Sequence, residues 1–467
     1  MLVTKEQPKQ ASPLNSPHFA RRLLLAAALL TVAGVSAFIL ARNLIDFPVY
    51  YAAGQSLLNG RTDLYAPDFA RGQTMDYRYP PFFLIALAPL WLAPYKAAAF
   101  LWCVFGVLEA ALCAVFVRRS EWRKGESQGN ERNASINDIG AWVLIVFATG
   151  QYYVMILHYG NAHLLAITLM FGSLYLFIRR RDSAAAALMS LAITIKLTPI
   201  LLLPYFAVKR RWKFLLLTIA VTGAINAAPA AYFGVSVNAL LLRTWRQHVI
   251  TDQEYHETNG PINLSLKGQL RRYLTHVDYD QRVDGDTRYS QVNFARMPSS
   301  RSDALWLIAS SALAVASLGL IWSTSRRRGE RFIDDHDGEA PSIKNGPDEV
   351  DSNQEALEIG LMICLMVLIG PLTSKIYFIA LLWPVACLAF HPNRKDAAAF
   401  VRNGLWVIAA AGLLAPLLPG RPAQRLLLVV GADFYLNCLV LLLTVYTLIR
   451  SHRRLAARSA EPRTQSR

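Results

Sequence analysis

Long runs of apolar residues recur along the 467-residue chain, and short polar segments separate them. A membrane-spanning helix needs about 20 predominantly apolar residues, and ten stretches approach that length. The pattern therefore predicts an all-α protein that crosses a membrane many times. The predicted spans are residues 22–41, 97–117, 139–158, 162–178, 214–232, 303–322, 356–371, 375–390, 400–418 and 426–449.

Two further apolar stretches do not fit a simple span. Residues 81–94 are too short, and prolines bracket and interrupt them, which predicts a half-helix lying in the outer interface. Residues 184–208 lie between the basic clusters 179–181 and 209–211. A single crossing there would place one cluster outside, so we predict a hairpin of two short helices. The layout then has about twelve transmembrane segments.

Lysine and arginine set the predicted orientation, because short basic loops stay in the cytoplasm. Both termini are then cytoplasmic, and two long polar segments, 42–80 and 233–302, are outer loops. Residues 323–354 are acidic and contain Gly and Pro, which is typical of a disordered cytoplasmic linker. The predicted divisions are an N-terminal segment 1–21, a transmembrane catalytic module 22–390, C-terminal helices 391–449 and a basic tail 450–467.

Composition agrees with a membrane protein, since 54% of the residues are hydrophobic and only 17% are charged. The net charge of +16 could indicate nucleic acid, but the basic residues stand in short clusters between apolar runs. That distribution favours topology signals and contacts with a lipid bilayer, and no nucleic-acid partner is expected. The five cysteines lie inside apolar segments without a CxxC pair, so neither disulfides nor zinc is indicated.

Asp46 is the most informative single residue, because it stands where the first span ends and Phe47, Tyr50 and Tyr51 follow it. A carboxylate at that depth is costly unless it has a function. One interpretation is that it caps a helix beginning at Pro48, its carboxylate accepting backbone N–H bonds. The other is a general base, whose pKa burial raises towards the working range.

Several short motifs follow one another over about residues 40–390. They are Asp46 with Tyr50-Tyr51-Ala-Ala-Gly54, Asn59-Gly60, Asp63-Leu-Tyr65, Tyr79-Pro80-Pro81, Gly160-Asn161-Ala-His163, Ile195-Lys196-Leu-Thr-Pro199, Lys209-Arg-Arg-Trp212, and Asn263-Leu-Ser-Leu266 followed by Arg271 or Arg272. Together they resemble the motifs of glycosyltransferase family 87. No single motif is decisive, but their order and spacing are fairly specific. One departure is Thr373-Ser374-Lys375-Ile-Tyr377, where the family often has a Ser-Trp-x-His-like stretch.

The resemblance implies a GT-C type fold and an inverting transfer at the outer face of the cell membrane. The sugar would come from a polyprenyl-phosphate donor and go to a glycan or glycolipid acceptor. Mannose is the family default, and another hexose or a pentose remains open. Asp46 would be the general base, and neither a metal nor another cofactor is expected.

The remaining candidate residues follow from the same resemblance and from the need for positive charge near a leaving phosphate. Lys196 is the first candidate for the donor phosphate, although a snorkelling lysine is the alternative. Arg271, Arg272 and Lys375 are reserves, the last as a cation in place of a histidine. The other expected substrate contacts are Tyr50, Tyr51, Tyr79, Asn161, His163 and Asn263.

Two other classes of protein share the spans and basic loops. A transporter or flippase of lipid-linked sugars would be expected to show internal repeats and charges at mid-membrane on several helices, and the sequence shows no such repeat. A non-catalytic scaffold would not need a carboxylate placed against aromatic residues in the first outer loop. We therefore favour the transferase.

Overall fold

A computed structural model of the chain describes residues 34–36, 39–73, 75–120, 131–247, 260–276, 289, 291–334, 347–390 and 399–460. All regular secondary structure in the described part of the chain is helical, as predicted. Their bounds are α2 Phe47–Leu58, α3 Pro81–Ala86, α4 Ala88–Leu92, α5 Tyr95–Arg119, α6 Glu131–Tyr159, α7 His163–Ile178, α8 Asp182–Ile195, η2 Thr198–Leu202, α9 Leu203–Val208, α10 Trp212–Ala227, α11 Ala230–Phe233, α12 Val235–Thr244, α14 Leu266–Leu274, α15 Ser299–Asp334, α16 Pro347–Ile369, η5 Lys375–Leu381, α17 Leu382–Phe390, α18 Ala399–Leu414, η7 Ala415–Leu417, α19 Arg421–Val430 and α20 Ala432–Ala460.

Within these residues, six helical stretches are long and apolar enough to cross a membrane. This makes the chain a multi-pass membrane protein. Shorter apolar helices cover four more of the predicted segments, and most of the first predicted span, 22–41, lies outside the described residues. The count of twelve therefore stays a prediction. The six stretches are Tyr95–Arg119, Ile139–Tyr159, Trp212–Phe233, Ser299–Thr324, Ala399–Leu417 and Ala432–Arg453.

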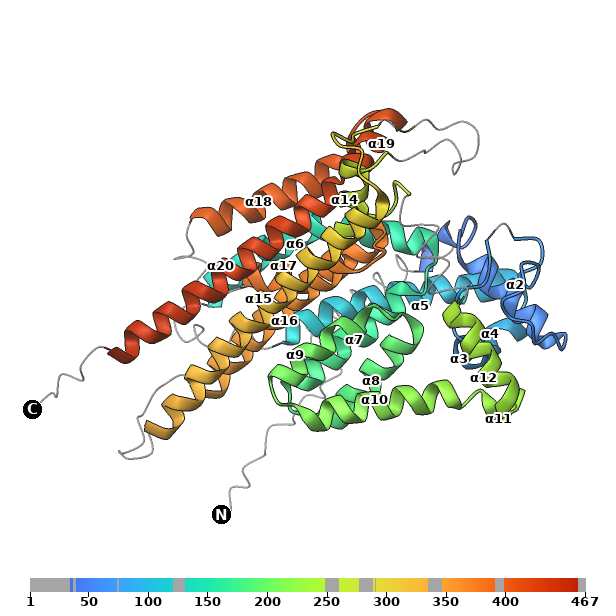
Figure 1. The fold of residues 1–467 in the computed structure, drawn as a ribbon, viewed down its shortest axis with the longest axis horizontal. Coiled ribbons are helices and arrows are strands. Elements are labelled where there is room, and N and C mark those ends of the chain that lie inside the picture. Colours follow the sequence, from blue (N-terminus) through green and yellow to red (C-terminus); the bar gives the residue numbers. More distant parts are fainter. Residues whose placement is uncertain are drawn as a thin grey trace, which may run out of the picture.

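The centre of the helical bundle is α16, whose residues from Glu355 to Leu368 are buried on every side. A helix that is apolar all round is stable only where other helices surround it. Figure 1 shows α15, α16, α18 and α20 running side by side, and α16 also contacts α17 and η5. The run at 356–371, which the sequence predicts only as a membrane span, thus forms a helix that protein, rather than lipid, surrounds.

Small residues let α18 approach its neighbours closely. A Cβ added at Gly412 would overlap the carbonyl oxygen of Phe147 in α6, and one added at Gly404 would lie 2.8 Å from Leu443 in α20. Membrane helices gain little from the hydrophobic effect when they associate, so close backbone approach through glycine is a principal source of packing energy. Gly404 and Gly412 therefore fix α18 against two helices at once.

The segment between the two basic clusters turns back on itself, as predicted. Helix α8 ends at Ile195, Lys196 is extended, and η2 begins at Thr198 with Pro199 in its first turn. Proline cannot continue the α8 hydrogen-bond ladder but fits the first turn of a new helix, so the break falls here. The segment α8–η2–α9 is called the hairpin below.

Two buried carboxylates of α16 hold both ends of the hairpin. Glu355 pairs with Arg180 before α8 at 3.1 Å and with Arg211 after α9 at 3.8 Å. Glu358 pairs with Lys209 at 2.9 Å, and both of these side chains are buried. Because Arg180 and Arg211 reach the same carboxylate, the chain returns to the side of the molecule from which it started.

The predicted first outer loop and the half-helix after it form a second hydrophobic core beside the bundle, where α2, α3 and α4 lie together at one end of the molecule (Figure 1). Gly54 of α2 allows this packing, because a Cβ there would overlap the Trp91 indole of α4. We call this the outer core, and its large buried side chains are Phe47, Tyr50, Phe69, Tyr77, Tyr79, Phe83, Trp91 and Trp102. The predicted half-helix at 81–94 is present as two short helices, α3 and α4.

The predicted disordered linker 323–354 is helical in the parts that the structure describes, and the prediction is wrong there. Helix α15 continues to Asp334, and α16 already begins at Pro347. Proline at the first helical position followed by Asp348 and Glu349 favours a helix N-terminus, and this local preference outweighs the low hydrophobicity. The segment 335–346 lies outside the described residues.

The Glu358→Ala variant is expected to be strongly destabilised. It would leave the buried Lys209 ammonium without its carboxylate, and removing one partner of a buried ion pair costs about 3–5 kcal/mol. Thermal unfolding of purified protein, followed by intrinsic fluorescence, measures the change. Arg180→Ala is the control, because its side chain is 48% exposed and Arg211 still faces the buried Glu355 carboxylate at 3.8 Å, so a smaller loss is expected. Equal losses of stability in both variants would mean that burial does not set the strength of these two ion pairs.

Candidate active site

The turn between α6 and α7 places the first polar group of the site. Gly160 ends α6 with a positive φ of 63°, a backbone conformation that glycine adopts at little cost. Its carbonyl accepts the Trp102 indole N–H at 2.9 Å, which ties the turn to the outer core. Asn161 follows, and its Oδ1 accepts the backbone N–H of His163 at 2.8 Å. This bond orients the amide so that Nδ2 points away from α7.

Asp46 lies opposite that amide, at the N-terminus of α2. Its backbone N–H donates to Tyr159 O at 2.8 Å, and its Oδ2 accepts Asn161 Nδ2 at 2.8 Å. The carboxylate makes no capping bond to α2, so the interpretation of Asp46 as a capping side chain is wrong. Pro48 in the first turn removes one N–H that would need a cap. The hydrogen bond from Asn161 directs the carboxylate away from α2.

Two tyrosines extend this hydrogen-bond network. The Tyr50 and Tyr79 hydroxyls are 2.9 Å apart, and Tyr79 also donates to Asn161 Oδ1 at 3.4 Å. The Tyr50 oxygen accepts the backbone N–H of Ala162 at 3.4 Å. The Tyr50 and Tyr79 rings pack edge to face with centroids 5.0 Å apart, so both ring packing and hydrogen bonds hold the network in place.

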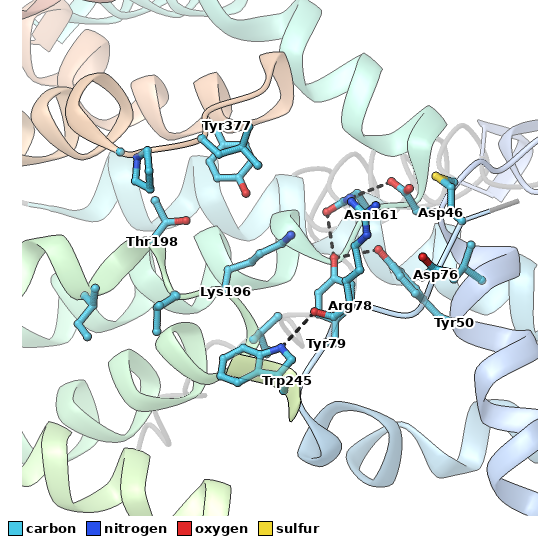
Figure 2. A pocket seen from close by; sticks show the side chains of 18 of the residues that line it. Asp46, Tyr50, Asp76, Arg78, Tyr79, Asn161, Lys196, Thr198, Trp245 and Tyr377 are labelled. Atoms are coloured by element: carbon cyan, nitrogen blue, oxygen red, sulfur yellow. Dashed lines mark hydrogen bonds between the residues drawn. The ribbon is translucent and has the colours of Figure 1, made fainter. Parts of the chain in front are cut away.

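The network borders a cavity of about 440 Å³ between the outer core and the hairpin, shown in Figure 2. Asp46, Tyr50, Tyr79 and Asn161 lie on one side of it, and Lys196 extends into it from the other. A volume of this size accommodates a small polar ligand such as a sugar. The other residues of the lining are Val49, Met75, Asp76, Arg78, Ile195, Leu197, Thr198, Ile200, Leu201, Trp245, Gly370, Pro371, Leu372 and Tyr377.

Lys196 reaches the cavity because the hairpin breaks at that residue. Its Nζ lies 4.9 Å from the centre of the Tyr79 ring and 6.0 Å from that of Tyr377. Aromatic faces stabilise a cation without neutralising it. Among the described residues no carboxylate lies within 4.0 Å of this ammonium, so its charge is available to a ligand.

The environment of Asp46 changes its acidity. Burial raises the pKa of this carboxyl above its ordinary value, because the charged form loses solvation. The Asn161 hydrogen bond and then the charges of Lys196 and Arg78 oppose the rise. A carboxylate with a raised pKa that still ionises is suited to accept a proton near neutral pH. Its Oδ1 accepts no hydrogen bond from the described part of the chain, and is open to a ligand hydroxyl.

Five of the predicted site residues therefore line the cavity: Asp46, Tyr50, Tyr79, Asn161 and Lys196. Two others, Tyr51 and His163, lie close by but outside the lining. Tyr51 points away, and its hydroxyl donates to Ala93 O at 2.8 Å within the outer core. His163 is fully buried behind the cavity wall, with its ring 4.1 Å from that of Tyr377. Both side chains support the walls of the cavity.

The predicted residues of the second outer loop contact protein groups. Arg271 forms an ion pair with Asp303, with Nε 2.8 Å from Oδ1. Arg272 is buried and donates to three carbonyls, the closest being Asn263 O at 2.7 Å. The Asn263 side chain binds both Thr373 N and Pro371 O at 3.1 Å, so it holds the segment that supplies one wall of the cavity.

Lys375 also lies outside the cavity lining. Its Nζ is 3.7 Å from Asp433 Oδ2 in α20, and Tyr152 donates to the same carboxylate at 2.7 Å. The resemblance predicts a cation from this stretch at the donor phosphate. In the structure its neighbour Tyr377 faces the cavity instead.

Sequence reasoning missed five polar or aromatic residues of the lining, namely Asp76, Arg78, Thr198, Trp245 and Tyr377. Arg78 directly precedes the Tyr79-Pro80-Pro81 motif, and Tyr377 stands in the stretch that departs from the family pattern, so their positions in or beside these stretches were an available signal. Trp245 directly follows α12, in a segment for which the sequence pattern predicts no element. No group of three or more metal-ligating side chains gathers among the described residues.

Comparison with known proteins defines the class. The model of glycosyltransferase family 87 matches residues 77–334, more than half of the chain, so the protein belongs to that family. This confirms the resemblance, although Asp46 and Tyr50 precede the matched range. No solved structure shows a significant match.

One curated relative is similar in sequence to this chain. The chain is similar to a polyprenol-phosphate-mannose-dependent α-(1-2)-phosphatidylinositol pentamannoside mannosyltransferase of Mycolicibacterium smegmatis. The two are 29% identical over 284 residues, which cover 57% of this chain and 62% of the relative. The match thus spans less than two thirds of the relative's length.

Proposed function

We propose that the protein is a polyprenyl-phosphate-sugar-dependent hexosyltransferase that transfers mannose or a related sugar. The acceptor is a glycan or glycolipid at the outer face of the cell membrane, and both termini are cytoplasmic. Family membership and the likeness to a mannosyltransferase support the class of reaction. The observation that carries the assignment is one cavity lined by a half-buried carboxylate, Asp46, and by an ammonium, Lys196.

The proposed mechanism is a single displacement with inversion. The acceptor hydroxyl donates its proton to Asp46 Oδ1 while its oxygen attacks the anomeric carbon of the donor. The bond between that carbon and the phosphate oxygen breaks, and polyprenyl phosphate leaves with the bonding electrons. Lys196 stabilises the negative charge that develops on the leaving phosphate. Asn161 holds Oδ2 of the base, so Oδ1 meets the acceptor in a fixed direction.

The hairpin supports the binding of a lipid donor. Ile195, Leu197, Ile200 and Leu201 surround Lys196 with apolar side chains, and Leu197 and Ile200 are about two fifths exposed. An isoprenoid chain can lie along this wall while its phosphate reaches the ammonium. The cation and the apolar wall therefore belong to the donor side of the cavity.

Asp46→Asn should fold normally and lose turnover by roughly 10²–10⁴-fold, the usual contribution of general base catalysis. Transfer from radiolabelled polyprenyl-phosphate mannose to phosphatidylinositol mannosides, with product identification, measures this. Asp76→Asn is the matched control, because Asp76 lines the same cavity and should keep its turnover at saturating acceptor. If Asp76→Asn is inactive and Asp46→Asn active, the base has been misassigned. A wild-type protein that transfers from no polyprenyl-phosphate sugar would refute the proposed function.

Lys196→Ala should raise the KM for the donor by roughly 10–100-fold, since hydrogen bonds to charged groups are worth about 1.5–3 kcal/mol. Lys196→Arg keeps the charge and should recover part of the loss. Lys375→Ala is the control, because that ammonium pairs with Asp433 outside the cavity. The KM for the donor, measured for all three variants at matched protein levels, tests this assignment. A donor KM that responds to Lys375 and not to Lys196 would reverse the assignment.

The pH dependence of turnover should report the pKa of Asp46. The base must be ionised, so activity is present above its pKa and falls as the pH drops through it. Because burial raises this pKa, the acidic limb should lie above the ordinary Asp value of about 3.9. Asn161→Ala removes a hydrogen bond that favours the charged form and should move the limb to higher pH. Tyr51→Phe is the control, because it removes a hydrogen bond elsewhere on α2 and should leave the acidic limb in place. An acidic limb that does not move in Asn161→Ala would contradict the proposed base.

A further inference from the structure

The cavity has two chemically different sides. The hairpin contributes apolar side chains around Lys196, whereas residues 75–79 and the end of α12 contribute Asp76, Arg78 and Trp245. If the lipid tail and phosphate of the donor occupy the hairpin side, the polar side is left for the second substrate. This reasoning rests on the proposed function, and it concerns residues to which neither the motifs nor the comparisons give a role.

Backbone geometry presents the two charged side chains of this polar side. Residues 76–78 lack helical structure, and burial alternates along them: Tyr77 and Tyr79 are buried in the outer core, while Asp76 and Arg78 remain exposed. A guanidinium offers several N–H donors in one plane, and a carboxylate offers two acceptor oxygens. Vicinal hydroxyl groups, each both donor and acceptor, match such planar groups.

Trp245 completes this side from a different element. Helix α12 buries Asn238 and Leu241, and Trp245 follows Leu241 by four residues, which places it on the same face. It begins a π-helical turn over 245–247, a feature that is frequent at functional sites. Its indole N–H donates to the Arg78 carbonyl at 3.2 Å, so one bond fixes both the ring and the segment that carries Arg78 (Figure 2).

The indole ring is therefore held at the cavity with its only polar atom already engaged. What remains for a ligand is an aromatic surface, which carries partial negative charge and attracts the weakly positive C–H groups of a neighbouring molecule. A pyranose ring has this character, with C–H groups on its faces and hydroxyls around its edge. An aromatic plane beside a guanidinium and a carboxylate thus suits a neutral sugar better than a lipid tail.

We propose that Trp245, Arg78 and Asp76 form the acceptor subsite and recognise the terminal pyranose of a glycan or glycolipid. Trp245 stacks on a face of the sugar, and Arg78 and Asp76 bind its hydroxyls. The subsite lines the same cavity as Asp46, so it directs one acceptor hydroxyl towards the free oxygen of the base. Acceptor choice is then set by the first outer loop and the end of α12, and donor choice by the hairpin.

The test compares binding of phosphatidylinositol pentamannoside with that of phosphatidylinositol, which lacks the sugars, to the full chain in nanodiscs. The wild type should bind the mannosylated lipid more tightly. Trp245→Ala and Trp245→Leu should weaken that binding roughly tenfold, the scale of an aromatic contact together with its buried area. Trp245→Phe keeps an aromatic face and loses the bond to Arg78, and it should bind within about threefold of wild type.

Trp406→Ala is the matched control, because Trp406 is an exposed tryptophan of α18 outside the cavity. Wild-type affinity in Trp245→Ala, no preference of the wild type for the mannosylated lipid, or equal losses in Trp245→Phe and Trp245→Ala would overturn the subsite. The last result would mean that Trp245 serves only to hold the Arg78 segment. Measured in parallel, sugar transfer separates the two proposals: binding without transfer refutes the proposed function, and normal transfer with an unchanged acceptor KM in Trp245→Ala refutes the subsite.

Discussion

The hydrogen bond between the Asn161 amide and the Asp46 carboxylate is the constraint on which the site depends. It joins the outer core to the helical bundle at the turn where α6 ends. The amide can point only one way, since its oxygen already accepts the His163 N–H. Turning it over would bring two acceptor oxygens together and release the carboxylate towards its own helix. The geometry of the candidate site therefore rests on the orientation of a single side-chain amide.

Several features of the site follow from local sequence rules. Pro199 predicts the break that exposes Lys196, and Gly160 ends α6 where Asn161 is needed. The largely apolar run at 356–371 predicts a helix there, and the structure has it as part of α16. These signals work because helix ends and burial depend mainly on nearby residues. They point to Asp46 by its place at the end of a span, whereas Asn161 is expected from the family resemblance and Lys196 from that resemblance together with its charge.

Charge pairing could not be predicted in this way. The sequence predicts three cations near a phosphate, namely Lys375, Arg271 and Lys196. In the structure Lys375 pairs with Asp433, 58 positions further along the chain, and Arg271 pairs with Asp303, 32 positions further along. Which cation remains available to a ligand is decided by tertiary contacts that carry no local signal. The same holds for Trp245, whose importance comes from a bond to a carbonyl of another loop.

The length of α8 has a consequence for how a substrate would be held. Its 14 residues make a helix of about 21 Å, whereas the hydrocarbon layer is about 30 Å thick. In the predicted topology the basic turns lie at one membrane surface, and the hairpin would then stop short of the opposite headgroups. A phosphate that reaches Lys196 would have to sink below the plane of its neighbouring lipids, into a region of lower dielectric. Attraction between opposite charges strengthens there, so the depth of the site would itself favour the lipid whose phosphate enters it over the other lipids of its leaflet.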